Sequence, residues 1–321
     1  MTEFKIYKLT FQTPLHLSRG KIGSYESSET ILHSDAIKSA LYVAALQLDK
    51  KNFADKLLNE LTVSSAFPFD KNECWLPRPV GFNFTDENAE NRKELKKISF
   101  FSTKQFSAIL NGEKNSEILD ASKNKIKLWE REVTQRVWMN GNPNKSTPFY
   151  LEKLYPTEET GVYFIAYSKL WDTSTFKEFE GVLKLLGENG VGLQRNLGNG
   201  RFGFENSTMK LDLPQNAENW ISLSLYRPTN ELELNDSLEK KSTNYQFIKR
   251  GGWISSPEDD EHIKVRKKSV MMFTVGSVFA FGVQNENILQ KGKSVNLKPD
   301  WDMPMNDIYR DGKAFFLPMK N

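Results

Sequence analysis

The sequence contains one cysteine, Cys74, and three histidines, His16, His33 and His262, among its 321 residues. A single cysteine excludes a disulfide framework. None of the histidines has a second histidine, a cysteine or a carboxylate at a spacing typical of metal ligands, so we expect no metal site and no cofactor. The motifs G-x-S-x-G, H-E-x-x-H and G-x-x-x-x-G-K-[ST] are also missing, and the sequence indicates no catalytic residue.

Long apolar runs and a strong net charge are missing as well. No apolar run approaches the roughly 18 residues that span a bilayer, and "MTEFKIYKLTF" lacks a signal-peptide pattern, so we expect a cytoplasmic protein without membrane contact. The formal charge is only +3, from 44 basic and 41 acidic residues, and a nucleic-acid surface would have to be a local patch. An apolar fraction of 38%, with 12% aromatic residues, is enough for one large domain or two ordinary ones.

Local patterns predict an α+β chain. "FKIYKLTFQ", closed by Pro14, predicts a strand, and "HSDAIKSALYVAALQL" predicts a helix capped by Ser34 or Asp35. Strands are then expected in "REVTQRVW", "FYLEKLYP" and "GVYFIAYSKL", a helix capped by Thr173 or Ser174 in "DTSTFKEFEGVLKLL", and a last strand in "RFGFENSTMKLDL". The elements follow the order β, α, ββ, α, β of a ferredoxin-like fold.

The stretch "LPQNAENW" indicates a domain boundary, with one domain over residues 1–213 and a second over residues 214–321. In the second domain, "KKSVMMFTVGSVFAFG" is the clearest predicted strand pair, although no residue identity indicates a repeat of the first domain. Residues 83–125 are highly charged and are expected to project from the core. They belong to an inserted region of about residues 81–150.

The stretch "GENGVGLQRNLGNGRFGFE", residues 187–205, places six of the 19 glycines within 17 positions. Glycine weakens helices and strands, so this concentration needs a physical reason. One explanation is an extended turn between a helix and a strand. The other is a backbone cradle for an anionic ligand, with Arg195 and Arg201 supplying positive charge.

Several segments together resemble a CRISPR-associated RAMP protein, and more specifically the subunit that caps the crRNA 5′ end in type III-A (Csm) effector complexes. They are the glycine-rich stretch, "TPLHLSRGKIGSYESSETILHSDAIKSAL", "KRGGWISSP", "RKKSVMMFTVGSVF" and "DGKAFFLP". The resemblance covers both ends and the middle of the chain and leaves the charged insertion and the linker unmatched. The family's glycine loop is usually richer in small and basic residues than this one, which has Gln194 and Asn196.

The resemblance implies two ferredoxin-like (RRM-like) domains with a thumb-like insertion. It implies a non-catalytic RNA-binding subunit that grips the crRNA 5′ handle and anchors the large Cas10-type subunit. An adjacent backbone RAMP subunit is a further expected partner. The segment "WEREVTQRVWMNGNPNKSTPFYLEKLY" resembles the thumb hairpin of such proteins, so target RNA is expected near it.

The candidate RNA-binding residues are glycines, whose backbone a nucleic acid can approach, together with nearby basic, polar and aromatic side chains. They are His16, Ser18, Arg19, Lys21, His33, Arg131, Arg136, Trp138, Gly190, Gly192, Arg195, Asn196, Gly198, Gly200, Arg201, Phe202, Lys249, Arg250, Gly251, Gly252 and Trp253.

Three alternatives remain open from the sequence. His33 is either a structural or RNA-contacting residue or, as in related endonucleases, a general acid or base. "KRGGWISS" is either a phosphate- and base-binding segment or a turn with a half-buried tryptophan. A crRNA-processing endoribonuclease of the same superfamily is the alternative function. A nucleotide-binding protein is less favoured, because the glycine loop follows a helix and precedes a strand, the reverse of the usual order.

Overall fold

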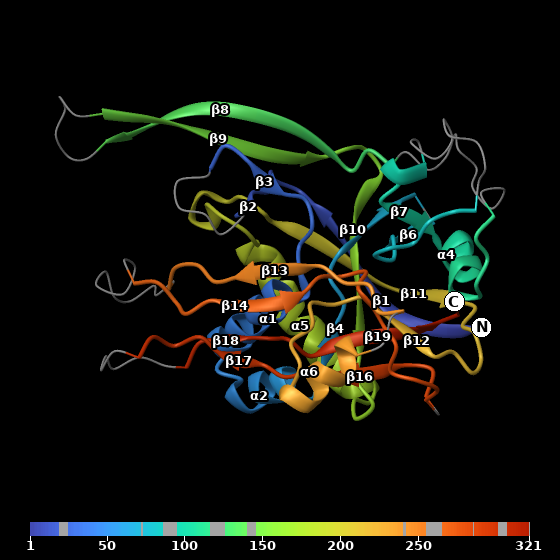
Figure 1. The fold of residues 1–321 in the computed structure, drawn as a ribbon. Coiled ribbons are helices and arrows are strands. Elements are labelled where there is room, and N and C mark those ends of the chain that lie inside the picture. Colours follow the sequence, from blue (N-terminus) through green and yellow to red (C-terminus); the bar gives the residue numbers. More distant parts are fainter. Residues whose placement is uncertain are drawn as a thin grey trace.

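The computed structural model describes residues 1–18, 25–71, 73–85, 95–115, 126–139, 146–239, 242–254, 265–284, 286–300 and 307–320. It has an α+β fold in which the strand pairs of the described residues are antiparallel, as expected for the fold class (Figure 1). Within the described residues, no helix is both long and apolar enough to cross a membrane.

The main sheet belongs to the N-terminal half. Its strand order is β11-β1-β10-β5-β6-β7, with β4 also paired to β10. The strands are β1 (Thr2–Phe11), β4 (Thr62–Val63), β5 (Phe67–Asp70), β6 (Glu73–Pro77), β7 (Phe100–Ser102), β10 (Thr160–Tyr167) and β11 (Phe202–Leu211). The helices of this half are α1 (Ser34–Gln47), α2 (Lys51–Glu60), α4 (Thr103–Leu110) and α5 (Thr173–Asn189).

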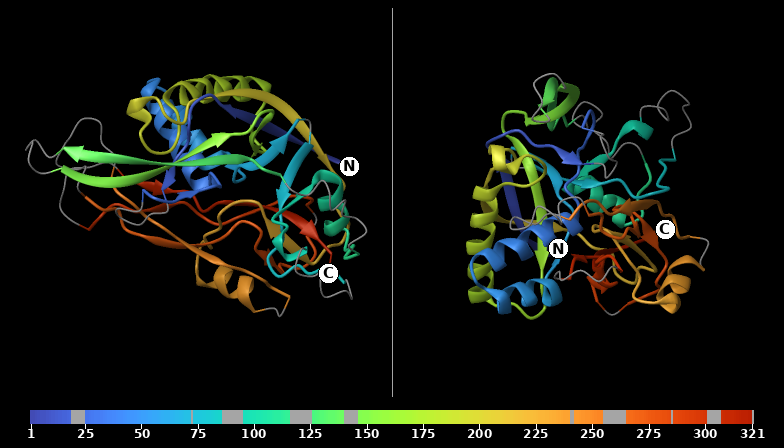
Figure 2. Two further views of the ribbon diagram at one scale, coloured as in Figure 1. Left: turned by 90° about the horizontal axis from the view of Figure 1, so that it is seen from above. Right: turned by 90° about the vertical axis from the view of Figure 1, so that its left-hand side faces the viewer.

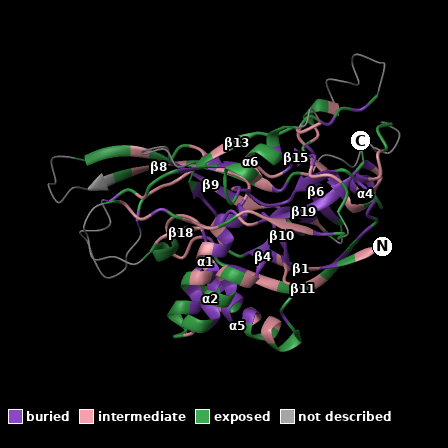
Figure 3. Ribbon diagram, turned by 60° about the horizontal axis from the view of Figure 1, so that its bottom comes forward, coloured by how far each residue is buried: buried purple, intermediate pink, exposed green. Residues whose placement is uncertain are grey.

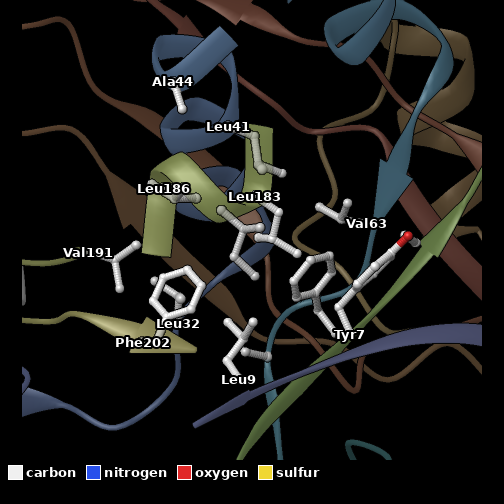
Figure 4. Close-up of a cluster of buried hydrophobic side chains, with 14 of the residues drawn as sticks. Tyr7, Leu9, Leu32, Leu41, Ala44, Val63, Leu183, Leu186, Val191 and Phe202 are labelled. Atoms are coloured by element: carbon white, nitrogen blue, oxygen red, sulfur yellow. The ribbon is translucent and has the colours of Figure 1, made fainter. Parts of the chain in front are cut away.

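β1 is buried on both faces because its side chains alternate between two cores. Tyr7 and Leu9 pack with Leu41 of α1 and Leu183 of α5 in the first core (Figure 4). Phe4 and Ile6 belong to a second core, together with aromatic and aliphatic residues of the C-terminal half such as Phe315. Alternation with a period of two puts successive side chains on opposite faces, so a strand with apolar residues on both faces is typical of a central position.

The C-terminal half contains a smaller sheet of order β15-β12-β19-β16 and two ribbons, β13-β14 and β17-β18. Its elements are β12 (Asn219–Ser222), α6 (Glu231–Leu238), β13 (Phe247–Arg250), β14 (Val270–Phe273), β15 (Val278–Phe279), β16 (Leu289–Lys291), β17 (Val295–Asn296), β18 (Tyr309–Arg310) and β19 (Ala314–Met319). The second core contains buried residues of β1, β10 and α4 together with residues of β12 and β19, which indicates that the two halves share it (Figure 3).

Most local predictions are confirmed, including β1, α1, β10, α5 and β11. The predicted helix caps are wrong. Asp172 caps α5, since its carboxylate accepts a hydrogen bond from the amide of Thr175. α1 begins after His33, whose side chain makes no capping bond, and Ser34 and Asp35 point instead to partners in the C-terminal half.

Two longer predictions are also wrong. β14 and β15 do not pair with each other, because β14 pairs with β13 and β15 pairs with β12. The charged residues 83–125 are not simply a projection from the core, although residues 86–94 and 116–125 lie outside the described residues. They include β7, which extends the main sheet, and α4, whose Phe106 and Ile109 are fully buried beside Phe101.

The first turns of α1 join the two halves through buried polar contacts. The Ser34 hydroxyl accepts a hydrogen bond from the Leu225 amide at 2.9 Å. The ammonium of Lys38 lies 3.0 Å from the carboxylate of Asp311, and both side chains are almost completely buried. These contacts explain why one face of an otherwise apolar helix contains serine, aspartate and lysine.

Asp35, which is fully buried, is the centre of this junction. Arg250 of β13 donates to both of its carboxylate oxygens, with Nε–Oδ2 at 2.9 Å and Nη2–Oδ1 at 3.1 Å. Arg310 of β18 brings Nη1 to 3.3 Å from Oδ2. Burial opposes ionisation of Asp35, but the charges of Arg250 and Arg310 hold its pKa below the ordinary value. A charged carboxylate is therefore stable in the interior.

His33 lies beside the junction, with Nε2 3.7 Å from a carboxylate oxygen of Glu29. Burial, and then the charge of Arg250, lowers the pKa of His33 from 6.5 to about 4. The unfolded chain therefore binds more protons than the folded chain between these two values. We predict that the free energy of unfolding falls as the pH is lowered from 6.5 towards 4, by up to about 3 kcal/mol from this residue.

The measurement is denaturant unfolding across this pH range for the wild type and for His33→Asn, which cannot gain a proton. We expect the variant to lose less stability than the wild type as the pH falls through the range. Parallel pH profiles for the two proteins would contradict the assignment.

Candidate nucleic-acid interface

The glycine-rich stretch forms a tight loop between α5 and β11 that lies against the segment after β1. Gly190 ends the helix at a φ of +76°, and its amide donates to the Leu186 carbonyl. The amide of Gly200 donates to the Pro14 carbonyl at 2.8 Å, and the amide of Leu193 donates to the His16 carbonyl at 2.9 Å. The loop is therefore fixed to the rest of the half by backbone hydrogen bonds.

Close packing within the protein accounts for three of the glycines. A Cβ on Gly190, Gly192 or Gly200 would lie 2.5, 2.4 or 1.9 Å from a backbone carbonyl oxygen of the protein itself. All three also have positive φ angles, which non-glycine residues rarely adopt. The sequence suggested that these glycines make room for RNA. The structure shows instead that the loop needs them for its own packing.

The tip of the loop differs from its base. Arg195, Asn196 and Leu197 form a short 3-10 turn, η2 (Arg195–Leu197), and all three are exposed. A Cβ on Gly198 would meet nothing within 4 Å, although its φ is +81°. The tip therefore presents a cation, an amide and an open backbone to the outside.

The two residues after the loop have different environments. Arg201 is exposed, and its Nε donates to the Glu188 carbonyl at 2.9 Å. Phe202 is 4% exposed and packs against Phe11 with a ring-centroid distance of 5.7 Å. Its burial does not fit base stacking, so we leave Phe202 out of the interface.

His16 is also buried, at 1% exposure, with Nδ1 2.7 Å from the carbonyl oxygen of Glu152. A ring so enclosed offers no edge to RNA, and we leave it out too. Ser18 is exposed at the end of β2 (Leu17–Ser18), which pairs with β3 (Ser28–Glu29). Arg19 and Lys21 lie outside the described residues.

The segment after β13 has an inner and an outer side. Arg250 points inward to Asp35, whereas Lys249 is exposed. Trp253 is 43% exposed, and the guanidinium of Arg266 lies 5.0 Å from the centre of its ring. Gly251 and Gly252 lie between these residues, and a Cβ on Gly252 would meet nothing within 4 Å. The outer side thus combines the exposed cation of Lys249 with the exposed ring of Trp253.

β8 (Trp129–Met139) and β9 (Ser146–Pro156) form a long two-stranded hairpin that extends beyond the body of the protein (Figures 1 and 2). The pairing confirms the predicted hairpin. Arg131 is tied to Glu152 by a contact of 3.3 Å between Nη1 and Oε1, and position 136 falls on the opposite face of the ribbon. The side chain of Trp138 lies outside what the structure describes.

The candidate elements gather on one side of the protein. The loop, the hairpin and the free ends of β13 and β14 all lie toward the left in Figure 1, and the view from above agrees (Figure 2). In the described part of the chain, no group of histidine, cysteine, aspartate and glutamate is placed to hold a metal ion. The described side chains of these elements offer hydrogen-bond donors, cations and exposed aromatic rings, among them those of Trp253 and Tyr150.

Sequence reasoning missed the residues that support this face. Glu152 contacts Arg131, the His16 ring and the Ser28 amide, and Arg310 contacts Asp35. Each contact joins residues far apart in the chain, and no local pattern marks them. The only available signal was a polar residue in an apolar stretch, such as Glu152 in "FYLEKLY".

Comparison with known proteins identifies relatives along the chain. Residues 215–319 match the family described as the CRISPR Csm4 C-terminal domain. Two curated relatives have the name "CRISPR system Cms protein Csm4". The one from Thermococcus onnurineus is 25% identical over 232 residues, which cover 68% of this chain and 72% of the relative. The one from Methanocaldococcus jannaschii is 22% identical over 360 residues, covering 92% and 93%.

Solved structures show the same fold over nearly the whole chain. A chain of the Csm3-Csm4 subcomplex in the type III-A CRISPR-Cas interference complex matches with a TM-score of 0.66 at 20% identity, covering 99% of this chain and 100% of that one. A chain of the Csm1-Csm4 cassette in complex with cA4 matches with a TM-score of 0.63 at 19% identity, covering 99% and 98%. The resemblance to RAMP proteins of type III-A CRISPR systems is therefore confirmed, and residues 215–319 of this chain match the Csm4 C-terminal domain family.

Proposed function

We propose that the chain is a non-catalytic RNA-binding subunit of a type III-A CRISPR effector complex, which grips the crRNA 5′ handle and anchors the large Cas10-type subunit. The observation that carries the proposal is the match of residues 215–319 to the Csm4 C-terminal domain. The fold shared with chains of Csm1-Csm4 and Csm3-Csm4 structures supports it and favours a large subunit and an adjacent backbone RAMP subunit as partners.

We also infer two ferredoxin-like domains, over residues 1–213 and 214–321. In the first, the strand order β11-β1-β10-β5, with α1 after β1 and α5 after β10, supports the assignment. The family match, which begins at residue 215, supports the boundary. For the second domain, the four-stranded sheet β15-β12-β19-β16 and the helix α6 are compatible with the assignment.

In this proposal the handle lies along the outer face that the loop tip and the segment after β13 form. Exposed cations at Arg195, Arg201 and Lys249 would attract phosphates, and the exposed ring of Trp253 would stack on a base. The hairpin, with the exposed side chains Val133, Val137 and Tyr150, would extend towards the target RNA. Single-stranded RNA is usually bound in this way, by splayed bases on aromatic and basic side chains.

The geometry favours binding over cleavage. A general acid or base must reach the proton that it transfers, but His16 is 1% exposed and His33 is 8% exposed. Burial also lowers the pKa of His33 to about 4, so it is neutral at pH 7. His262, the third histidine, lies outside the described residues.

We predict that the protein leaves repeat RNA uncut, because neither described histidine reaches the surface. The measurement is denaturing electrophoresis of labelled repeat RNA after incubation with the protein, with His33→Asn as the matched variant. Shortening by the wild type that His33→Asn abolishes would overturn the binding-only proposal in favour of an endoribonuclease.

The charge of Arg195 gives a second prediction. Arg195→Gln in the reconstituted complex should weaken binding of handle RNA and reduce the slope of log K against log salt by about 0.7, the share of one phosphate on a single strand. Lys184→Gln is the control, since Lys184 is exposed on α5 and its loss changes the net charge equally. An equal change of slope in both variants would show that only overall charge matters.

The two ends of the glycine loop give a third prediction. Gly200→Ala should destabilise the fold by about 3 kcal/mol or more, since its Cβ would overlap the Val191 carbonyl. Gly198→Asn should fold nearly normally, because asparagine tolerates a positive φ and the space is open, but it should weaken retention of crRNA. Thermal melting and crRNA retention separate the two effects. Normal retention in Gly198→Asn would remove the loop tip from the interface.

A further inference from the structure

The junction between the two halves contains more positive than negative charge. The N-terminal half contributes the carboxylates of Glu29 and Asp35, and the C-terminal half contributes Arg250, Lys267 and Arg310. Arg250 contacts both carboxylates, at 2.9 Å from Asp35 and 3.6 Å from Glu29. Three cations thus face two anions, and the arginine side chains are only 13% and 14% exposed.

The excess charge is accompanied by donors that lack acceptors. Arg310 uses Nη1 on Asp35, but its Nε is buried and has no hydrogen-bond partner among the described residues. The Nδ1 atom of His33, a residue more than nine-tenths buried, is a further polar atom without a hydrogen-bond partner in the described part of the chain. The ammonium of Lys267 makes no hydrogen bond or ion pair with any described residue. Unpaired buried donors are unfavourable, and they are rare in folded proteins unless a ligand or water completes them.

Lys267 shows the electrostatic consequence. Burial, and then the charge of Arg310 with a contribution from Arg250, lowers its pKa from 10.5 to about 8, although Asp35 opposes the shift. The charged ammonium is therefore poorly compensated in the protein alone. An anion beside it would relieve the repulsion from both arginines.

The surroundings indicate which anion fits. The Lys267 amide donates to the Gly252 carbonyl at 3.0 Å, and Arg310 Nη2 lies 3.4 Å from the Gly251 carbonyl. The cluster is thus directly beneath the segment whose outer side contains the half-exposed ring of Trp253. Cations beside an exposed aromatic ring are the combination by which proteins bind the phosphates and bases of single-stranded nucleic acid.

We propose that Lys267 and the Nε edge of Arg310 form a binding site for one phosphodiester group of single-stranded RNA, with the adjoining base on Trp253. This inference rests on the proposed function, because the ligand is part of the handle. Arg250 keeps its two bonds to Asp35 and holds the carboxylate away from the phosphate. Arg310, with one contact to Asp35, turns its remaining edge to the ligand. An ammonium and a guanidinium edge supply donors suited to phosphate oxygens.

The test combines variants with chemically neutralised phosphates in the reconstituted complex. Lys267→Met is compared with Lys268→Met, a matched control because Lys268 is paired on the surface with Asp300. Arg310→Lys is a second variant that keeps the charge beside Asp35 but removes the Nε donor. Each protein is assayed with handle RNAs that have a single methylphosphonate at successive positions.

We expect one methylphosphonate position to weaken binding to the wild type and to Lys268→Met by about tenfold, the effect of a charge-assisted hydrogen bond. Lys267→Met should bind unmodified handle RNA about tenfold more weakly and should show no further loss at that position. Arg310→Lys should show the same loss of sensitivity with a melting temperature close to that of the wild type.

Additive effects of Lys267→Met and every methylphosphonate, with handle binding by the wild type intact, would overturn this site but not the proposed function. Failure of the wild-type complex to bind handle RNA at all would overturn the proposed function and the site with it. Melting temperatures measured without RNA exclude unfolding as the cause, since the loss of a partly buried ammonium that is repelled by two arginines should not destabilise the protein.

Discussion

The arrangement of the two halves depends on the ion pairs that the ionised carboxylate of Asp35 makes with two arginines. Asp35 lies at the start of α1, fully buried, and receives two hydrogen bonds from Arg250 and a contact from Arg310. Removing one partner of such a buried pair usually costs about 3–5 kcal/mol, because the other charge is left unpaired. The same helix contributes Ser34 and Lys38 to the junction, so α1 is bonded to residues of the C-terminal half at three positions of its first turns.

The junction between the two halves and the candidate RNA interface share the strand β13 and the residues after it. β13 and the residues after it send Arg250 inward and leave Lys249 and Trp253 outside. Side chains that alternate along one strand therefore hold the halves together on one face and form the candidate interface on the other. The position of the outer residues is fixed by the inner ones, and a shift between the halves would move Lys249 and Trp253 relative to the glycine loop of the N-terminal half.

The fold was predictable from the sequence where local patterns decide it. Alternating apolar residues define β1, β8 and β9, and a helical stripe defines α5. Ser34 and Asp35 were misread as caps because the sequence near a helix start does not reveal partners at positions 225, 250 and 310. The glycine loop is a similar case. Its glycines indicate that another group comes close to the backbone, but the sequence does not reveal whether that group belongs to the protein or to a ligand. Asp35 and its partners could be found only after the chain was folded.

The central position of β1 has a consequence for how the chain reaches its native state. Its two neighbours, β10 and β11, come from residues 160–167 and 202–211, and the core on its second face includes Phe315 and Leu317. β1 is therefore synthesised long before the strands and core residues with which it pairs and packs. Such nonlocal pairing slows folding and leaves an apolar strand open to wrong contacts in the meantime. Rapid completion of the chain, or a binding partner that shields this strand during synthesis, would therefore govern the yield of folded protein.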